Sequence, residues 1–187
     1  MTHHESTDLI SVIVADHRDV DNAFSELETG TGTPEHRRQL VDHVIAELVR
    51  HSVAEEMWMY PAARDALPDG DEIAEHEIEE HAEAEKIMDQ LYGLEPDDAR
   101  FDGLLEKLIS AIRHHIEDEE RDLLPRLREA CSQDQLDDLG RKVLNAKKVA
   151  PTRPHPAAPD RPPLNRVLAP GAGLVDRMRD ALSGRKV

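Results

Sequence analysis

Two stretches of the sequence share a pattern of residues that commonly bind metal ions. Residues 51–61 read HSVAEEMWMYP and residues 115–125 read HIEDEERDLLP, so both follow H-x-x-x-E-E-x-x-x-x-P. The same shift of 64 positions places His17 on His81. Each half of this repeat supplies two imidazoles and one carboxylate, a combination suited to holding transition-metal ions.

The candidate ligands lie on helix faces that are otherwise apolar. Apolar residues recur there at alternating steps of three and four positions, the period of a helix face that packs into a core. A single histidine or glutamate on such a face is usually structural. Burying six uncompensated ionisable groups would be costly, whereas a metal ion would bond and neutralise them. The candidate ligands are His17, His51, Glu55, His81, His115 and Glu119.

The repeat also predicts how many metal ions are bound. Two sets of two histidines and one glutamate are related by a pseudo-twofold axis, and carboxylates near that axis can bridge two ions. We therefore expect a dinuclear centre. A site rich in nitrogen and carboxylate ligands and free of thiolate favours iron, with manganese and zinc as weaker candidates.

The elements that must position these side chains are helices. Long stretches rich in Glu, Ala and Leu are interrupted by turn-forming residues at 29–34, 67–70 and 93–98. Because the connections are short, the pattern predicts an all-α, up-down-up-down four-helix bundle. Ser132 is a candidate N-cap for a short fifth helix. The predicted helices span about 6–28, 34–66, 70–92, 98–129 and 132–147.

Charge and proline divide the chain into two regions. Residues 1–140 carry 12 Lys and Arg against 37 Asp and Glu, whereas residues 141–187 carry 11 against 3. Of the 12 prolines, 7 lie within 151–170, which predicts an extended segment rather than a helix. We therefore expect a bundle with its fifth helix at 1–150 and a Pro-rich basic tail at 151–187.

Composition excludes several classes of function. The formal net charge of −17 argues against nucleic acid as a partner, because nucleic-acid binding needs a cationic surface. A single cysteine, Cys131, is incompatible with a disulfide framework or a cysteine-based metal site. No apolar run approaches the roughly 20 residues of a membrane span, and the first residues lack the core of a signal peptide. The sequence predicts a cytoplasmic protein with no membrane span.

The motifs resemble those of the haemerythrin-like (HHE cation-binding) family. The resemblance rests on DH at 16–17, HSVAEE at 51–56, EEH at 79–81 and HHIEDEE at 114–120, and it covers about residues 7–130. It implies a four-helix bundle that holds two iron ions, bridged by carboxylates and by an oxo or hydroxo group.

The family resemblance also implies a role for each candidate ligand. Glu55 and Glu119 match the positions of the carboxylates that bridge the two irons. The terminal imidazole ligands match His17, His51, His81 and His115.

The repeat breaks at one informative position. Glu77 lies four residues before His81, where the family often has histidine, and its partner under the repeat is Ile13, which cannot bind a metal ion. One iron would gain Glu77 beside His81 and His115, and the other would keep an open position. His76 is the rival for this extra ligand, but it lies about 140° around the helix from His81.

The open position is expected to face an apolar pocket that excludes water. Dioxygen, hydrogen peroxide or nitric oxide could bind there as a small oxidant ligand. Tyr60 is a candidate hydrogen-bond donor outside the ligands. The expected pocket residues are Ile13, Val20, Leu48 and Trp58.

The leading functional interpretation is a non-haem di-iron protein with peroxide (catalase-like) or redox-stress chemistry at the open position. A Glu77 carboxylate in place of imidazole adds negative charge, which favours iron(III) over reversible oxygen carriage. The sequence leaves open whether the protein is an enzyme. The alternative is a binding-only oxygen carrier or iron/NO sensor without turnover, and a third interpretation is an interaction module whose metal is structural.

The tail carries a short amphipathic pattern surrounded by basic residues. Two interpretations are compatible with it: a mostly disordered tail, or a helix that docks either onto the acidic bundle or onto a protein partner. Its apolar stripe consists of Leu174, Val175, Met178, Ala181 and Leu182.

Overall fold

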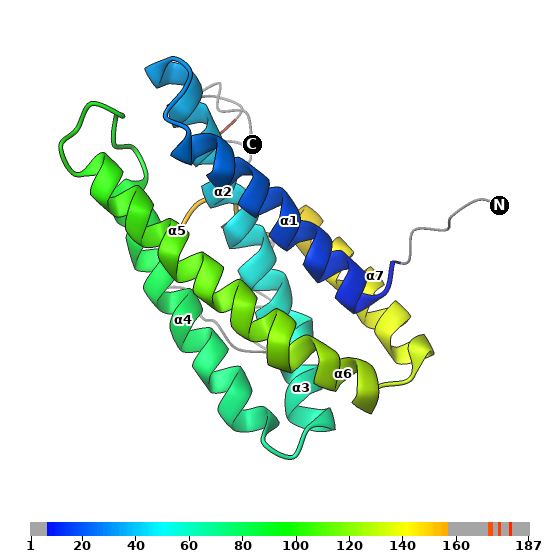
Figure 1. Ribbon diagram of the computed structural model, residues 1–187. Coiled ribbons are helices and arrows are strands. Elements are labelled where there is room, and N and C mark those ends of the chain that lie inside the picture. Colours follow the sequence, from blue (N-terminus) through cyan, green and yellow to red (C-terminus); the bar gives the residue numbers. More distant parts are fainter. Residues whose placement is uncertain (1–6, 157–171, 174–175, 177–179, 181–187) are drawn as a thin grey trace.

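The computed structural model describes residues 7–156 together with Ala172, Gly173, Asp176 and Asp180. Within this part of the chain every regular element is a helix, which confirms the predicted all-α class (Figure 1). The elements in chain order are α1 (Leu9–Glu28), α2 (Pro34–Ala54), η1 (Glu55–Met59), α3 (Tyr60–Ala66), α4 (Gly70–Leu91), α5 (Phe101–Asp118), η2 (Glu119–Leu123), α6 (Leu124–Ala130) and α7 (Gln133–Val149).

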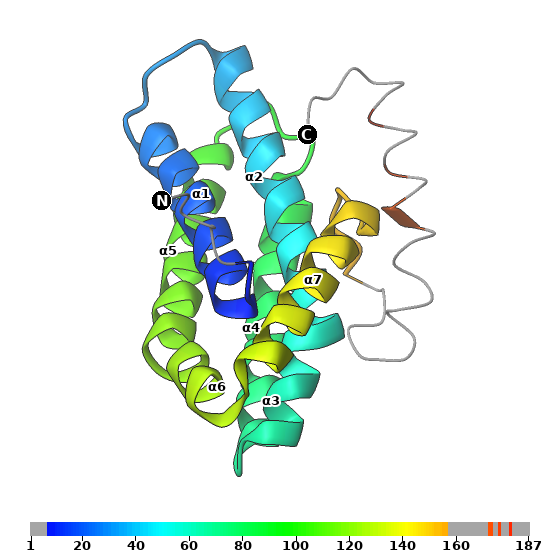
Figure 2. The same ribbon diagram turned by 90° about the vertical axis from the view of Figure 1, so that its right-hand side faces the viewer.

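These elements form four long rods and one shorter helix. The rods are α1, the continuous run α2–η1–α3, then α4, and the continuous run α5–η2–α6. Successive rods pack side by side, with α1 against α2, α3 against α4, and α4 against α5. The shorter helix α7 packs against α1 and α2 (Figure 2). The predicted four-helix bundle with a fifth helix is therefore confirmed.

Side chains that cap the helices explain where several of them begin. Asp8 accepts a backbone hydrogen bond from the first turn of α1 at 2.8 Å, and Thr33 caps α2 in the same way. Ser132, the predicted N-cap of the fifth helix, forms a capping box with Gln135. Such a cap typically stabilises a helix by about 1 kcal/mol. Gly140 allows α7 to approach α1, because a Cβ there would lie 2.0 Å from a carbonyl oxygen just before α1.

Two π-helical turns, η1 and η2, interrupt the second and fourth rods. They occupy matching positions of the repeat, each just ahead of a proline, Pro61 or Pro125. Proline has no N–H and so cannot donate the regular helical hydrogen bond. In η1, the N–H of the residue before the proline, Tyr60, bonds to the carbonyl oxygen of Glu55, five residues earlier. Residues five apart lie about 140° apart on a regular α-helix, whereas a π turn brings them onto one face. The turn therefore places Tyr60 on the same side as Glu55.

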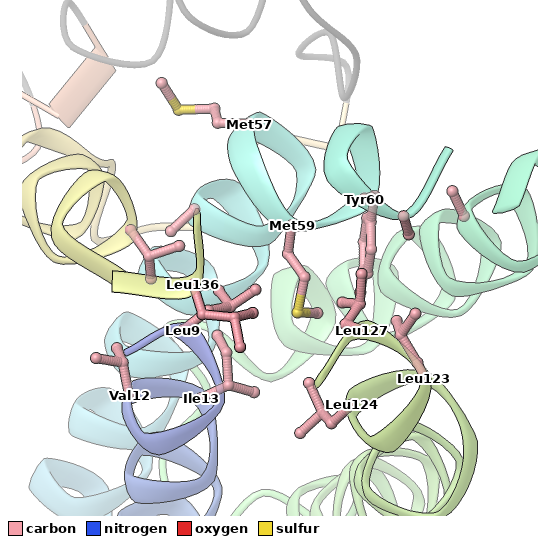
Figure 3. Close-up of a cluster of buried hydrophobic side chains, with 14 of the residues drawn as sticks. Leu9, Val12, Ile13, Met57, Met59, Tyr60, Leu123, Leu124, Leu127 and Leu136 are labelled. Carbon is pink, nitrogen blue, oxygen red and sulfur yellow. The ribbon is translucent and has the colours of Figure 1, made fainter. Parts of the chain in front are cut away.

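Two apolar clusters fill the bundle, and the candidate ligands lie between them. The first apolar cluster includes Ile13 and Leu124 (Figure 3). The second apolar cluster includes Val20 and Phe24. On α1, His17 lies between the residues of the first apolar cluster and those of the second. On each of the other three rods the candidate ligands also lie where one cluster ends and the other begins. The polar centre is therefore closed off by packed aliphatic side chains on both sides along the bundle.

The segment after α7 contacts the described residues of the tail. Asp176 and Asp180 are buried. The Thr152 N–H donates to Asp176 at 3.1 Å, and Arg153 pairs with Asp180 at 2.6 Å. The Pro-rich stretch 157–171 and the predicted apolar stripe of the tail lie outside the described residues, and the division of the chain into two regions stays a prediction.

None of the described helices is both long enough and apolar enough to cross a membrane.

Candidate metal centre

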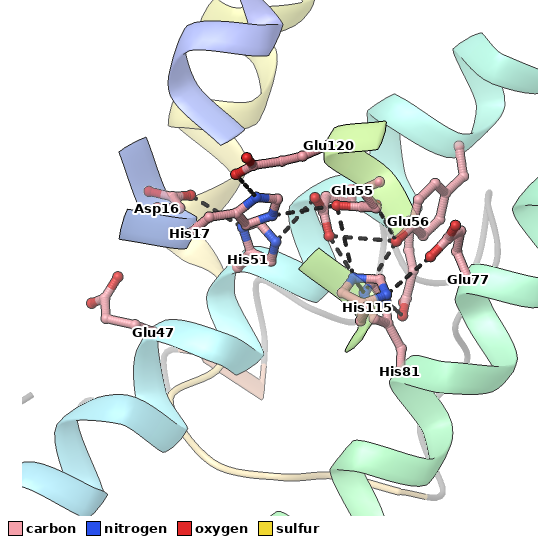
Figure 4. A network of polar contacts seen from close by, with 12 residues as sticks. Asp16, His17, Glu47, His51, Glu55, Glu56, Glu77, His81, His115 and Glu120 are labelled. Carbon is pink, nitrogen blue, oxygen red and sulfur yellow. Dashed lines mark hydrogen bonds and ion pairs between the residues drawn. The ribbon is translucent and has the colours of Figure 1, made fainter. Parts of the chain in front are cut away.

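The six candidate ligands converge in the middle of the bundle, with one histidine from each rod (Figure 4). The four imidazoles are 2–5% exposed and the two carboxylates are 0% exposed. The ligands and their elements are His17 on α1, His51 on α2, Glu55 on η1, His81 on α4, His115 on α5 and Glu119 on η2.

One half of the centre, the His17–His51 half, combines two imidazoles with both glutamates. His17 Nε2 lies 3.3 Å from Glu119 Oε2, and His51 Nε2 lies 3.0 Å from Glu55 Oε1. One nitrogen or oxygen atom from each of these four residues lies within 4.8 Å of all the others. This spacing is close enough for all four to bind one cation.

The other half, the His81–His115 half, shares the same carboxylates. Glu55 Oε2 lies 3.4 Å from His81 Nε2, and Glu119 Oε2 lies 3.8 Å from His115 Nε2. The two Nε2 atoms of this half are 3.1 Å apart. Each glutamate therefore faces both halves, which is the arrangement that bridging carboxylates require.

Several of these buried atoms have no hydrogen bond within the described part of the chain. They are His17 Nε2, Glu55 Oε1, Glu77 Oε2 and Glu119 Oε2. A buried polar atom that makes no hydrogen bond costs roughly 1–3 kcal/mol, and a cation bound by these atoms would remove that cost. The donor set of imidazole nitrogens and carboxylate oxygens suits iron, manganese or zinc. The residues present therefore fit a bound metal.

The outer nitrogen of every ligand histidine contacts a carboxylate. Donation from Nδ1 to a carboxylate leaves the lone pair on Nε2, the nitrogen that faces the centre. Each imidazole is thereby oriented as a metal ligand. The four contacts are His17 Nδ1 to Glu120 at 3.0 Å, His51 Nδ1 to Asp16 at 3.3 Å, His81 Nδ1 to Glu56 at 3.1 Å and His115 Nδ1 to Glu80 at 3.0 Å.

These outer carboxylates obey the same 64-residue repeat as the ligands. Glu56 matches Glu120, and Asp16 matches Glu80. The two members of each pair contact histidines that are themselves matched by the repeat: Glu56 contacts His81 and Glu120 contacts His17, and likewise Asp16 contacts His51 and Glu80 contacts His115. These four carboxylates were not predicted from the sequence. Each is nevertheless adjacent in sequence to a candidate ligand: Glu56 and Glu120 follow a glutamate ligand, and Asp16 and Glu80 precede a histidine ligand.

Glu77 is buried beside the outer nitrogen of His115, whereas His76 is exposed. Glu77 is 3% exposed, and its Oε2 lies 2.9 Å from His115 Nδ1. It forms a possible cation-binding group with His115 and Glu119. Burial raises the pKa of Glu77, and the charge of Glu119 adds to this, against the lowering effect of His115. The side chain of His76 is 58% exposed and pairs with Glu80.

Tyr60 is buried within the His81–His115 half. Its hydroxyl donates to Glu119 Oε1 at 3.1 Å and lies 3.1 Å from His81 Nε2. The repeat partner of Tyr60 is Leu124, so the opposite half has no equivalent hydroxyl. The sequence suggested a hydrogen-bond donor outside the ligands, and the Tyr60 hydroxyl lies where it donates to Glu119.

A small cavity of about 10 Å³ lies beside the histidines, with room for roughly one water molecule. Its walls include the predicted pocket residues Val20 and Leu48. The other two predicted residues lie elsewhere, since Ile13 is in the first apolar cluster and Trp58 packs beneath Lys142. The full set of lining residues is Asp16, His17, Val20, Leu48, His51, Ser52, His81, Ile112, His115 and Ile116.

Metal binding at neutral pH is expected to release protons. Burial lowers the pKa of His51, but Glu55 and Asp16 outweigh it and raise the pKa from 6.5 to about 10. The pKa of His81 and that of His115 are also raised, because carboxylates outweigh burial. A cation must displace these protons, so its affinity should rise with pH up to about 10.

Calorimetric titration of metal-free protein with zinc at pH 7.5, in two buffers of different ionisation enthalpy, measures this release. We expect at least about one proton per chain. Heats that do not depend on the buffer would contradict it.

The fold and the geometry together define a helical bundle with buried His and Glu clusters suited to cations. The chain belongs to a known family of such proteins: the family model described as the hemerythrin HHE cation binding domain matches residues 8–127. The predicted family is confirmed.

Two curated relatives are similar to the chain. An uncharacterised hemerythrin-like protein of Schizosaccharomyces pombe is 27% identical over 180 residues, which cover 96% of this chain and 88% of that protein. A protein named DNA nickase from Nostoc is 25% identical over 136 residues, which cover 73% of this chain but 38% of the longer relative. No solved structure matches the chain.

Proposed function

We propose that the chain holds two iron ions and that a small oxidant, hydrogen peroxide above all, binds at one of them. The observation that carries this proposal is a difference between two halves that are otherwise matched. Glu77 and Tyr60 lie in the His81–His115 half. Their repeat partners, Ile13 and Leu124, are buried in the first apolar cluster.

This difference supports an open position at the metal of the His17–His51 half. That metal has the shared glutamates and two imidazoles, with aliphatic side chains where the other half has polar groups. The cavity beside the four histidines has Val20 and Leu48 among its walls and has room for about one water-sized molecule. An apolar wall around a small space favours a neutral ligand such as peroxide or dioxygen over bulk water.

An iron pair that cycles between iron(II) and iron(III) exchanges two electrons, so one peroxide can be reduced to two waters while a second is oxidised to dioxygen and supplies the two protons. The chain's own residues hold charge and protons for this reaction. Bound to a cation, the Glu77 carboxylate adds negative charge that favours iron(III). In the metal-free protein, burial and then the nearby Glu119 and Glu55 raise the pKa of Tyr60 well above 10. The phenol therefore keeps its proton and its hydrogen bond to Glu119, the carboxylate that faces both halves.

Replacing Tyr60 with phenylalanine tests the proposal. Iron-loaded wild type mixed with peroxide should release gas rapidly, and Tyr60→Phe should release it at least about tenfold more slowly while keeping its iron, because Glu119, which faces both halves, loses a hydrogen-bond donor. Oxygen-electrode traces and iron analysis of the same samples measure both effects.

Tyr92→Phe is the matched control, because Tyr92 is the second of the two tyrosines and stacks with Arg153 away from the centre. Gas release from Tyr92→Phe should equal that of wild type. Wild-type protein that holds iron but releases no gas would contradict the catalytic part of the proposal.

The same cavity also supports a binding-only function as oxygen carrier or NO sensor. A neutral diatomic ligand fits a small apolar space beside an open metal position. A stable optical band that appears with oxygen and disappears on its removal, without gas release from peroxide, would favour this second candidate.

A further inference from the structure

A second group of potential cation ligands lies on the outer face of α4 and α5. Each helix presents a histidine followed four positions later by a carboxylate, so each pair shares one helix face. His76 Nε2 lies 3.5 Å from Glu80 Oε1, and His114 Nε2 lies 3.6 Å from Asp118 Oδ2. His114 Nε2 is also 3.8 Å from Glu80 Oε1. We call these four residues the surface cluster.

The surface cluster is reachable from solvent. The side chain of His76 is 58% exposed and that of His114 is 65% exposed. One ligand atom each from His76, Glu80 and Asp118 lies within 4.8 Å of the others. One imidazole and two carboxylates at this spacing are a donor set that divalent transition metals accept, and His114 lies 3.6 Å from Asp118 and 3.8 Å from Glu80.

Next to the surface cluster is an acidic hollow of about 480 Å³. Among its lining residues Arg121 is the single basic one, and it pairs with Glu117. A hollow walled by negative charge concentrates cations at its mouth. The lining residues are Asp69, Glu72, Ile73, His76, Glu77, Asp118, Arg121 and Asp122.

Glu77 connects the hollow to the buried centre. It lines the hollow, yet its side chain is almost completely buried and its Oε2 has no hydrogen bond. The same oxygen lies 2.9 Å from His115 Nδ1. Glu80 makes a similar connection, because its Oε1 faces the surface cluster while its Oε2 contacts His115 at 3.0 Å.

We propose that the surface cluster captures divalent cations and passes them through the acidic hollow, by way of Glu77, into the buried centre. The two apolar clusters pack on both sides of the centre along the bundle, so a hydrated cation that entered from either end would have to pass apolar side chains. Stepwise exchange of imidazole and carboxylate ligands lowers the cost of removing its water. This inference rests on the proposed function, because it requires that the buried centre bind metal.

The test is the rate at which metal-free full-length protein takes up cobalt(II), followed by stopped-flow absorption of the visible bands. A His76→Ala/His114→Ala double variant should fill its buried centre at least about tenfold more slowly at micromolar cobalt, because the steering and capture site is lost. Its final spectrum and its final content of tightly held cobalt should equal those of wild type. Asp118→Asn should slow uptake in the same direction.

A His36→Ala/His43→Ala double variant is the matched control, since it also removes two exposed imidazoles but from α2. Its uptake rate should equal that of wild type. Equal rates in wild type and in both surface-cluster variants would overturn this inference and leave the proposed function standing. Wild-type protein whose spectrum never develops would overturn the proposed function as well, so the two failures are distinguishable.

Discussion

A Glu55→Ala variant is expected to lose both metal ions, although it removes a single side chain. Glu55 faces both halves of the centre, with Oε1 beside His51 and Oε2 beside His81. Burial raises the pKa of this carboxyl group, but the two histidines outweigh burial and hold the pKa well below 4.5, so the group is ionised and ready to bind. Metal analysis after gel filtration should give less than about one tenth of the wild-type content, because both sites lose a bridging ligand.

Glu47→Ala is the matched control, because it removes a glutamate eight residues earlier on the same helix. Glu47 pairs with Arg50 and Lys147 and is not among the ligands. The control should keep the full metal content. A Glu55→Ala protein that still held both ions would show that this carboxylate does not bridge them.

A Glu77→His variant is expected to move the protein toward reversible oxygen binding. Imidazole would replace a carboxylate beside His115, which removes negative charge from the His81–His115 half. Less negative charge stabilises iron(II), so the reduced, iron-loaded variant should oxidise in air about tenfold more slowly than wild type. The absorbance of the oxidised centre, followed from anaerobic mixing onward, measures the rate.

Glu79→His is the control for Glu77→His, because it places the new imidazole at an exposed position two residues further along α4. This control should oxidise at the wild-type rate. A Glu77→His variant that oxidised as fast as wild type would show that the negative charge of Glu77 does not determine how readily the iron centre is oxidised.

The bundle and the convergence of the ligands could be predicted from sequence because two periodicities coincide. The helical period placed His17 and His51 on faces that pack inward, and the 64-residue repeat matched them with His81 and His115. In a helical bundle with short connections, most arrangements bring these inward faces together.

What the sequence did not reveal depends on departures from regular helix geometry and on contacts between rods. Tyr60 was suggested as a hydrogen-bond donor outside the ligands, but regular α-helical geometry would place it about 140° from Glu55. The π turn ahead of Pro61 removes that difference. The contact between Glu120 and His17 joins residues 103 positions apart, so no local pattern predicts which histidine each outer carboxylate orients.

The pocket was predicted in part for a related reason. Val20 and Leu48 line the small cavity. Trp58 lies within the π turn η1, so the direction expected for its side chain from a regular α-helix does not apply. Packing beneath Lys142 of α7 accounts for its position.

The measurement that tests the central claim most directly is metal analysis of the purified, iron-loaded protein combined with optical spectroscopy before and after peroxide. The geometry predicts about two irons per chain, as in other bundles whose facing helices supply paired carboxylates and histidines, together with a charge-transfer band that changes on addition of peroxide. A content of one iron or none after loading, with a spectrum that peroxide leaves unchanged, would contradict the claim that the chain holds two irons and binds peroxide.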